Sequence, residues 1–189
     1  MFVTLSDIAC DIAKNACESG ADTVELEVME IGRDFRFIVR DNGKGMSGEE
    51  TGRALDPLNS VDFPGTSKTG LGIPLLIRTV NDAAGGWDLH TEKGVGTTIS
   101  VWFNNENPET PPVGDLATMF CDAMAMPGPR EFVVRRVRKT GANDVRYELR
   151  KTELQSALGG LNDSPSLTLL STYLQSLENP PAVYGGGFD

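Results

Sequence analysis

Four short strings of polar residues and glycine, in a fixed order, constrain the fold of this chain more than any other feature of its sequence. They are Asp11–Asn15, Asp41–Met46, Gly70–Gly72 and Gly94–Thr98. Each string adjoins a segment with a regular hydrophobic period, which predicts that it lies on a helix or at the end of a strand. Glycine-rich strings are common individually, so the information comes from the presence of all four in one order.

The hydrophobic pattern predicts the elements that surround these strings. Leu5, Ile8, Ile12 and Ala16 recur at helical spacing and predict a helix over residues 5–19. The pattern then predicts four strands with alternating apolar residues, at 24–28, 35–39, 87–91 and 97–103. Between the second and third strands it predicts a loop rich in Pro, Gly, Ser and Thr at 56–69 and a second long helix at 73–84. This order favours an α+β fold, a two-layer α/β sandwich in which a mixed sheet has helices on one face.

A polar segment at residues 104–112, with three prolines, predicts a linker to a second part of the chain. Beyond it the pattern predicts a helix, a hairpin and two further helices, at residues 113–126, 132–138 with 145–149, 151–158 and 164–177. The expected organisation is therefore an N-terminal domain over residues 1–106, a small α+β C-terminal unit over residues 113–178, and a flexible tail over residues 179–189.

Composition excludes several classes of function. The formal net charge of −10 argues against a nucleic-acid-binding surface, which needs clustered Lys and Arg. Three cysteines without a CxxC pair predict neither a disulfide framework nor a zinc site. No apolar run approaches the roughly 20 residues of a membrane span, and the N-terminus lacks the pattern of a signal peptide. We therefore expect a cytoplasmic protein with no membrane association.

The chemistry of the strings suits a phosphorylated ligand. Asp11 and Asn15 lie four residues apart, so both project from one helix face. An Asn oxygen is a suitable ligand for Mg²⁺, and a carboxylate is a suitable general base for an oxygen nucleophile. Gly70 and Gly72 precede a helix whose free N–H groups suit phosphate oxygens. The alternative for Asp11 and Asn15 is an exposed polar helix face.

Taken together, the four strings resemble the N, G1, G2 and G3 boxes of the GHKL superfamily, which contains the gyrase, histidine-kinase and MutL ATPases. The resemblance implies ATP and Mg²⁺ as cofactors and assigns Asn15 as the magnesium ligand. It also implies that the Asp41 carboxylate accepts a hydrogen bond from the adenine amino group, and that Thr97 contacts adenine directly or through water. The residues expected to bind the nucleotide are Asn15, Asp41, Gly43, Gly45, Met46, Thr69, Gly70, Leu71, Gly72 and Thr97.

Two residues are candidates for a catalytic role by the same resemblance. Asp11 occupies the position that is acidic in the GHKL ATPases and protein kinases, where it activates water or an acceptor hydroxyl. Lys68 lies in the segment 63–69, which resembles the ATP lid, and is expected to reach the terminal phosphate. The alternatives are a surface carboxylate or indirect magnesium contact for Asp11 and a solvated lid lysine for Lys68.

A closer resemblance covers residues 3–178, to the small stand-alone histidine-kinase-like proteins found beside iron-only hydrogenase genes in anaerobic bacteria. It is carried by the segments 5–16, 56–57, 70–76 and 112–117. Leu58 and Asn59 depart from the aromatic pair usual in that group. The resemblance implies a hydrogenase-associated or signalling protein as partner.

The only histidine, His90, falls in a predicted strand. A self-contained histidine kinase needs its phosphoacceptor histidine on a long helix, so we do not expect this chain to be one. The favoured hypothesis is a protein kinase that phosphorylates a partner in trans, in bacterial signalling or redox-enzyme regulation. An ATPase that acts as a conformational switch and a nucleotide-sensing protein with negligible turnover remain as alternatives. Asp11 favours the first two, and the C-terminal unit is expected to be a docking or homodimer surface.

Overall fold

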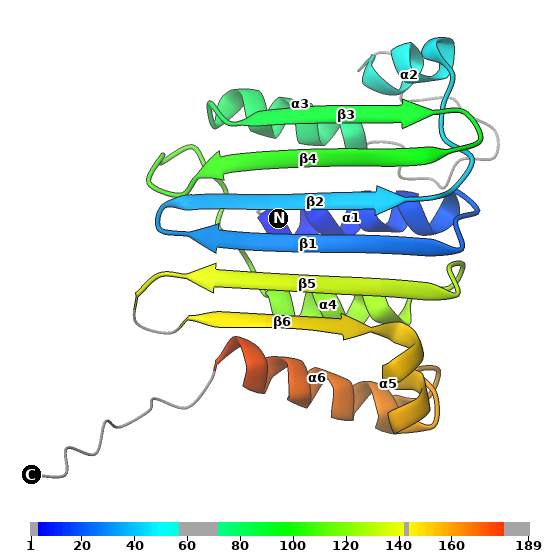
Figure 1. The fold of residues 1–189 in the computed structure, drawn as a ribbon. Helices are drawn as coiled ribbons and strands as arrows, with labels where there is room; N and C mark the ends of the chain where they lie inside the picture. Colours follow the sequence, from blue (N-terminus) through cyan, green and yellow to red (C-terminus); the bar gives the residue numbers. More distant parts are fainter. Residues whose placement is uncertain (1–3, 57–71, 142–143, 180–189) are drawn as a thin grey trace, which may run out of the picture.

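A single six-stranded sheet organises the computed structural model, which describes residues 4–56, 72–141 and 144–179 (Figure 1). The strands are β1 Thr23–Ile31, β2 Asp34–Asp41, β3 Gly86–Glu92, β4 Gly96–Asn104, β5 Glu131–Lys139 and β6 Val145–Arg150. Their order across the sheet is β3-β4-β2-β1-β5-β6. β5 runs parallel to β1 and every other neighbouring pair is antiparallel, so the predicted mixed sheet is confirmed.

Helices cover one face of this sheet. The helices of the described residues are α1 Leu5–Glu18, α2 Gly48–Leu55, α3 Gly72–Asp82, α4 Leu116–Ala125, α5 Lys151–Leu158 and α6 Ser164–Glu178, of which α1, α3 and α4 lie against this face. In Figure 1, α1, α3 and α4 lie behind the strands, and α6 lies beyond the β6 edge. The arrangement is the expected α+β sandwich with helices on one face. Within the described ranges, none of the helices combines the length and the hydrophobicity that a membrane crossing requires.

α1 begins and ends where local chemistry dictates. The Thr4 hydroxyl accepts a hydrogen bond from the Asp7 N–H, and the Asp7 carboxylate accepts one from the Thr4 N–H, which completes a capping box. Gly20 follows the helix with φ +80°, the left-handed conformation that commonly ends helices. The apolar stripe of Ile8 and Ile12 is buried against the sheet, as the sequence period predicts.

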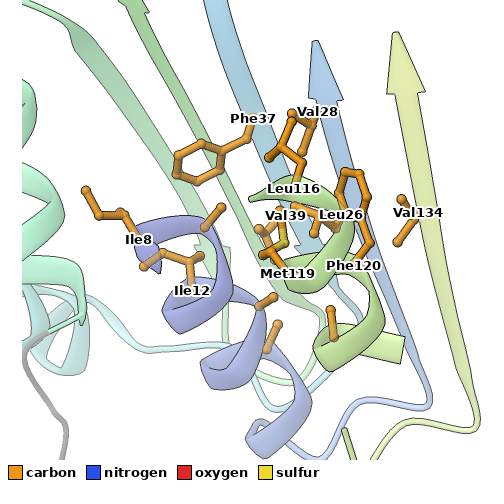
Figure 2. Close-up of a cluster of buried hydrophobic side chains, with 14 of the residues drawn as sticks. Ile8, Ile12, Leu26, Val28, Phe37, Val39, Leu116, Met119, Phe120 and Val134 are labelled. Carbon is orange, nitrogen blue, oxygen red and sulfur yellow. The ribbon is translucent and has the colours of Figure 1, made fainter. Parts of the chain in front are cut away.

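The hydrophobic core lies between the sheet and the helices, and residues from both parts of the chain contribute to it. Figure 2 shows Phe37 and Val39 of β2 close to Ile12 of α1, with Met119 and Phe120 of α4 beside them. All five side chains are almost completely buried. Burial of apolar surface on this scale is the main stabilising term of a domain, so the two parts are stabilised by one core.

The C-terminal hairpin extends the first sheet. β5 pairs with β1 along its whole length, from Thr23 opposite Glu131 to Ile31 opposite Lys139. The predicted helices and hairpin of residues 113–178 are present, but the sequence pattern carried no sign that the hairpin would join the N-terminal strands. α4 and its flanking loops connect β4 to β5, and they carry the chain past β2 and β1 to the other side of the sheet.

The C-terminal end of α6 is attached to the sheet through a buried arginine. Arg136 of β5 is 1% exposed and forms ion pairs with Glu30 at 2.7 Å and with Glu178 at 3.1 Å. The Tyr147 hydroxyl donates a further hydrogen bond of 2.6 Å to Glu178. A buried charge is tolerated only when it is paired in this way, so these contacts fix α6 against β5 and β6.

Candidate functional site

The sequence strings converge at the end of β2, on the face of the sheet that the helices cover. Asp41 is the last residue of β2, and Thr97 of β4 is its neighbour in register. Asp41 is an even number of residues away from the core residue Phe37 in β2, and Thr97 is an even number away from the core residue Ile99 in β4. Because side chains alternate along a strand, Asp41 and Thr97 point towards the layer that contains α1.

The Asp41 carboxylate is held in a defined position. Its Oδ1 atom accepts hydrogen bonds from the Gly43 N–H at 2.8 Å and from the Ser19 hydroxyl at 3.0 Å. Burial raises the pKa of Asp41 above its ordinary value, while hydrogen bonds from Gly43, Ser19 and the Thr97 N–H act in the opposite direction. The result is a half-buried carboxyl group with its orientation fixed before any ligand arrives.

Two glycines make the turn after Asp41 possible. A Cβ atom at Gly43 would overlap the Ser19 hydroxyl and lie 2.9 Å from Asp41 Oδ1. Gly45 has φ +56°, and a Cβ there would overlap the carbonyl of Glu92. Only glycine allows the backbone to approach this closely and to adopt this conformation. The turn after Asp41 is therefore closely packed at both glycines.

The loop after Asp41 is fastened to the β3–β4 turn. The Gly94 N–H donates to the Lys44 carbonyl at 2.7 Å, and the Met46 N–H donates to the Thr91 hydroxyl at 2.9 Å. The hydroxyl oxygens of Thr91 and Thr97 lie 3.0 Å apart. The second and fourth strings are thus one rigid structure rather than two separate loops.

A stripe of polar residues on α1 runs from the loop after Asp41 to the start of α3. Asp11, Asn15 and Ser19 recur every four residues, so they lie along one side of the helix over about 12 Å. Ser19 contacts Asp41 at one end. Further along, a Cβ at Gly72 would lie 3.1 Å from Asn15 Nδ2, which places the first residue of α3 directly beside Asn15.

Asp11 lies one helical turn before Asn15, and both residues are exposed. Burial raises the pKa of its carboxyl above the ordinary value, and the Asp7 charge acts in the same direction, whereas Lys14 lowers it. A carboxylate with a raised pKa is a better proton acceptor than an ordinary aspartate. The structure places the carboxyl on the same side of α1 as Asn15 and Gly72, as the spacing predicts.

The structure brings together most of the predicted site. Asp41, Gly43, Gly45, Met46 and Thr97 form one cluster, and Asn15 with Gly72 forms a second along the same helix stripe. The remaining predicted residues lie outside the described part of the chain, namely Lys68, Thr69, Gly70 and Leu71.

Two contributing residues were missed by sequence reasoning. Ser19 was missed because it follows the first string, although its four-residue spacing from Asn15 was a usable signal. Thr91 was missed because nothing in a strand sequence shows that its hydroxyl accepts from the Met46 N–H across the site.

The geometry suits a ligand with an amino group at one end and phosphates at the other. Asp41 supplies a fixed acceptor beside close-packed backbone. Asn15 supplies the oxygen donor that a hard cation prefers, and the start of α3 beside it supplies a helix N-terminus for anionic oxygens. The residues present therefore fit a nucleotide and its magnesium ion.

Comparisons with known proteins bear on the fold and on the family of the chain. Nitrogen regulation protein NtrY of Azorhizobium caulinodans is 26% identical over 118 residues, which are 57% of this chain and 15% of that protein. A crystal structure titled as the N-terminal domain of a DNA repair protein matches with a TM-score of 0.51 and 13% identity, over 87% of this chain and 58% of the other. This structural likeness shows the fold alone. The chain thus spans only part of each of these relatives.

The family comparison is the more informative one, because the matched segment ends after β4 and so contains all four strings. The model of the histidine kinase-, DNA gyrase B- and HSP90-like ATPases matches residues 3–107, which is more than half of the chain. The chain belongs to the histidine kinase-, DNA gyrase B- and HSP90-like ATPase family.

Proposed function

We propose that this protein binds Mg²⁺-ATP between α1, α3 and the end of β2, and that it phosphorylates a partner protein in trans. The observation that carries the proposal is the Asp41 carboxylate, which two hydrogen bonds on Oδ1 orient at one end of the α1 stripe. A carboxylate held in this way accepts a hydrogen bond from an exocyclic amine and discriminates against a carbonyl at the same position.

Each residue of the stripe has a distinct role in this proposal. Asp41 reads the adenine amino group, and the Thr97 hydroxyl contributes a second polar contact. Asn15 holds the magnesium ion through its side-chain oxygen, and the magnesium ion offsets the negative charge of the phosphates. The helix N-terminus at Gly72 binds phosphate oxygens next to Asn15.

Asp11 is the proposed general base. The nucleophile is a hydroxyl group of the partner protein. The hydroxyl proton moves to the Asp11 carboxylate while the hydroxyl oxygen bonds to the terminal phosphorus of ATP. The bond from that phosphorus to the bridging oxygen breaks, and ADP leaves. Because partial burial raises the pKa of Asp11, this carboxylate is a stronger proton acceptor than an ordinary aspartate. We propose a signalling or hydrogenase-associated protein as the partner.

A conformational ATPase switch is the second candidate, and one observation favours it. α1 carries the site stripe, yet its first turn is bound to the C-terminal part through hydrogen bonds from Leu5 N–H to Pro112 and from Ser6 N–H to Val113, both 2.9 Å. α1 also packs against α4 in the shared core. A nucleotide-dependent movement of α1 would therefore reach the C-terminal helices without phosphotransfer.

The proposal is tested by titration calorimetry with Mg²⁺-ATP on the wild type and on Asp41→Asn, together with assays of phosphate release and of phosphoprotein formation in bacterial extract. We expect binding by the wild type and loss of binding in Asp41→Asn. Asp11→Asn should retain binding and lose turnover, which separates the base from the binding residues.

The outcomes distinguish the candidates. A labelled extract protein that is absent with Asp11→Asn supports the kinase. Phosphate release without a labelled protein supports the switch. Binding with no turnover in either assay supports a nucleotide sensor. Absence of binding by the wild type contradicts all three.

A further inference from the structure

The second face of the sheet points away from α1, α3 and α4. In Figure 1 this open face is towards the viewer. Ile38 and Val133 are buried on this face, and neither belongs to the core cluster beneath the helices. Their side chains point to the opposite side of the sheet from those of the core residues, because side chains alternate along a strand. The remaining side chains of the open face are mostly charged, and their pairing differs between its two ends.

At the end nearest the nucleotide site, the described cations of the open face are paired. Arg40 lies 3.8 Å from Glu25 and 3.6 Å from Glu27. Arg135 contacts Glu25 and Glu148, both at 2.8 Å, and Arg150 contacts Glu148 at 2.7 Å. These ion pairs run across β2, β1, β5 and β6, so the positive charge at this end is already neutralised.

The far end of the open face has a different composition. The strand registers align Trp102, Arg36, Met29, Val137 and Arg146 in one line across β4, β2, β1, β5 and β6. We name these five residues the cross-strand row. At about 4.8 Å between neighbouring strands the row spans roughly 19 Å. Two of its residues are arginines, and two neighbouring apolar residues, Met29 and Val137, lie between them.

The arginines of the row have no partner of their own. In the ranges that the structure describes, neither Arg36 nor Arg146 forms an ion pair or a side-chain hydrogen bond, and both are exposed. Lys139, which follows Val137 on the same face, is likewise exposed and unpaired within those ranges. A protein of net charge −10 thus has three cations at this end of the open face that form no ion pair within the described ranges.

Exposed apolar side chains accompany these cations. Trp102 is 44% exposed and Ile31, beside Lys139, is 49% exposed. A Cβ at Gly86 would overlap the Trp102 ring, so the indole lies directly on the β3 backbone with one side towards solvent. Exposed aromatic residues beside arginines are the composition of protein-binding hot spots.

We propose that the cross-strand row is a docking site for an extended acidic segment of a partner protein, in which carboxylates and apolar side chains follow one another along the same side of the segment. The carboxylates pair with Arg36 and Arg146, and the apolar residues cover Trp102 and Met29. The intervening apolar residues Met29 and Val137 favour a protein segment over a nucleic acid, because apolar side chains can cover them whereas a phosphate backbone cannot. The row lies at the opposite end of β2 from Asp41, so docking leaves the nucleotide site open.

The probe for this site is a synthetic fluorescent peptide of about eight residues, in which every second residue is Leu or Glu in turn and the residues between them are Ser. In extended form its Leu and Glu side chains lie on one side, and the peptide is long enough to cover the row. Fluorescence anisotropy measures its binding to the full chain. A matched peptide with Gln in place of Glu tests the charge, and a single-stranded oligonucleotide tests the nucleic-acid alternative. We expect binding of the Glu peptide alone, weakened by salt.

Substitutions identify the site. Arg36→Gln with Arg146→Gln, and separately Trp102→Ala, should each reduce affinity for the Glu peptide by about tenfold or more. Arg78→Gln is the matched control, since Arg78 is an exposed arginine of α3 with a side chain 82% exposed. It should leave affinity unchanged. Thermal melting of every variant confirms that folding is retained.

Several results would overturn the proposal. They are no binding of the Glu peptide, equal binding of the Gln peptide, tighter binding of the oligonucleotide, or equal loss with Arg78→Gln. Sedimentation of the wild type provides a further test. A dimer that Trp102→Ala dissociates would show that a second copy of the chain, rather than an acidic segment, covers the row.

Discussion

The Ser19 hydroxyl donates a 3.0 Å hydrogen bond to the Asp41 carboxylate, 22 positions further along the chain. Ser19 is the C-cap of α1, and Asp41 is the last residue of β2. This bond therefore joins the helix that carries Asn15 to the carboxylate that is expected to read adenine.

Ser19→Ala should weaken ATP binding without unfolding the protein. The variant loses one of the two hydrogen bonds on Asp41 Oδ1, and the remaining bond from Gly43 leaves the carboxylate less well oriented. A hydrogen bond to a charged group contributes about 1.5–3 kcal/mol, so affinity should fall by about tenfold or more. Calorimetry measures the affinity. Unchanged affinity would contradict a role for Ser19 in the site.

Gly43→Ala should abolish binding, whereas Gly48→Ala should not. The new Cβ at position 43 would overlap the Ser19 hydroxyl and displace it from Asp41. Gly48 begins α2 and has open space around it, so the same substitution there disturbs nothing nearby. Calorimetry on the two variants gives a matched comparison. Equal affinities would show that the turn after Asp41 does not form the site.

ATP affinity should fall with decreasing pH, starting at a higher pH than for an ordinary aspartate. Burial raises the pKa of Asp41 in the folded protein, and below that pKa the protonated carboxyl is no longer a charged acceptor. The same shift means that the folded state holds this proton more tightly than the unfolded state. Its contribution to stability therefore decreases as pH rises from about 3.8 through the folded pKa.

The control for this pH dependence is Ser19→Ala. The Ser19 hydrogen bond lowers the pKa of Asp41, so its removal should move the binding profile to higher pH. ATP titrations at a series of pH values on both proteins give the two profiles. Coincident profiles would show that another group controls the pH dependence.

Asn15→Ala should remove the magnesium-dependent part of ATP affinity. The substitution removes the proposed side-chain oxygen ligand and creates no clash with Gly72, which lies beside Asn15. The wild type should bind ATP more tightly with Mg²⁺ than with EDTA, and the variant should show the same weak affinity in both. A retained difference would place the magnesium ligand elsewhere.

Glu178→Ala should destabilise the whole protein. The substitution leaves Arg136, which is fully buried, with only Glu30 as an acidic partner, and it removes the acceptor of the Tyr147 hydroxyl. Breaking a buried ion pair typically destabilises by about 3–5 kcal/mol. Urea denaturation measures the change. Glu109→Ala, at an exposed glutamate, is the control and should change stability little.

The sequence by itself determined the local structure and the composition of the site. The helical period from Leu5 to Ala16 determined α1, and the strand alternation together with Gly43 and Gly45 determined where β2 ends and turns. These features are local, because a hydrophobic period and a backbone conformation depend on near neighbours in the chain. They were sufficient to indicate the family and most of the residues that cluster at Asp41.

Only the tertiary structure decided how the distant segments meet. It placed β5 beside β1, so that both parts of the chain share one sheet, and it paired Thr91 with Met46 across the site. It also left Arg36 and Arg146 exposed while it paired Arg40 and Arg135. The physical reason is that strand order and register arise from packing between residues far apart in sequence, which no local pattern records.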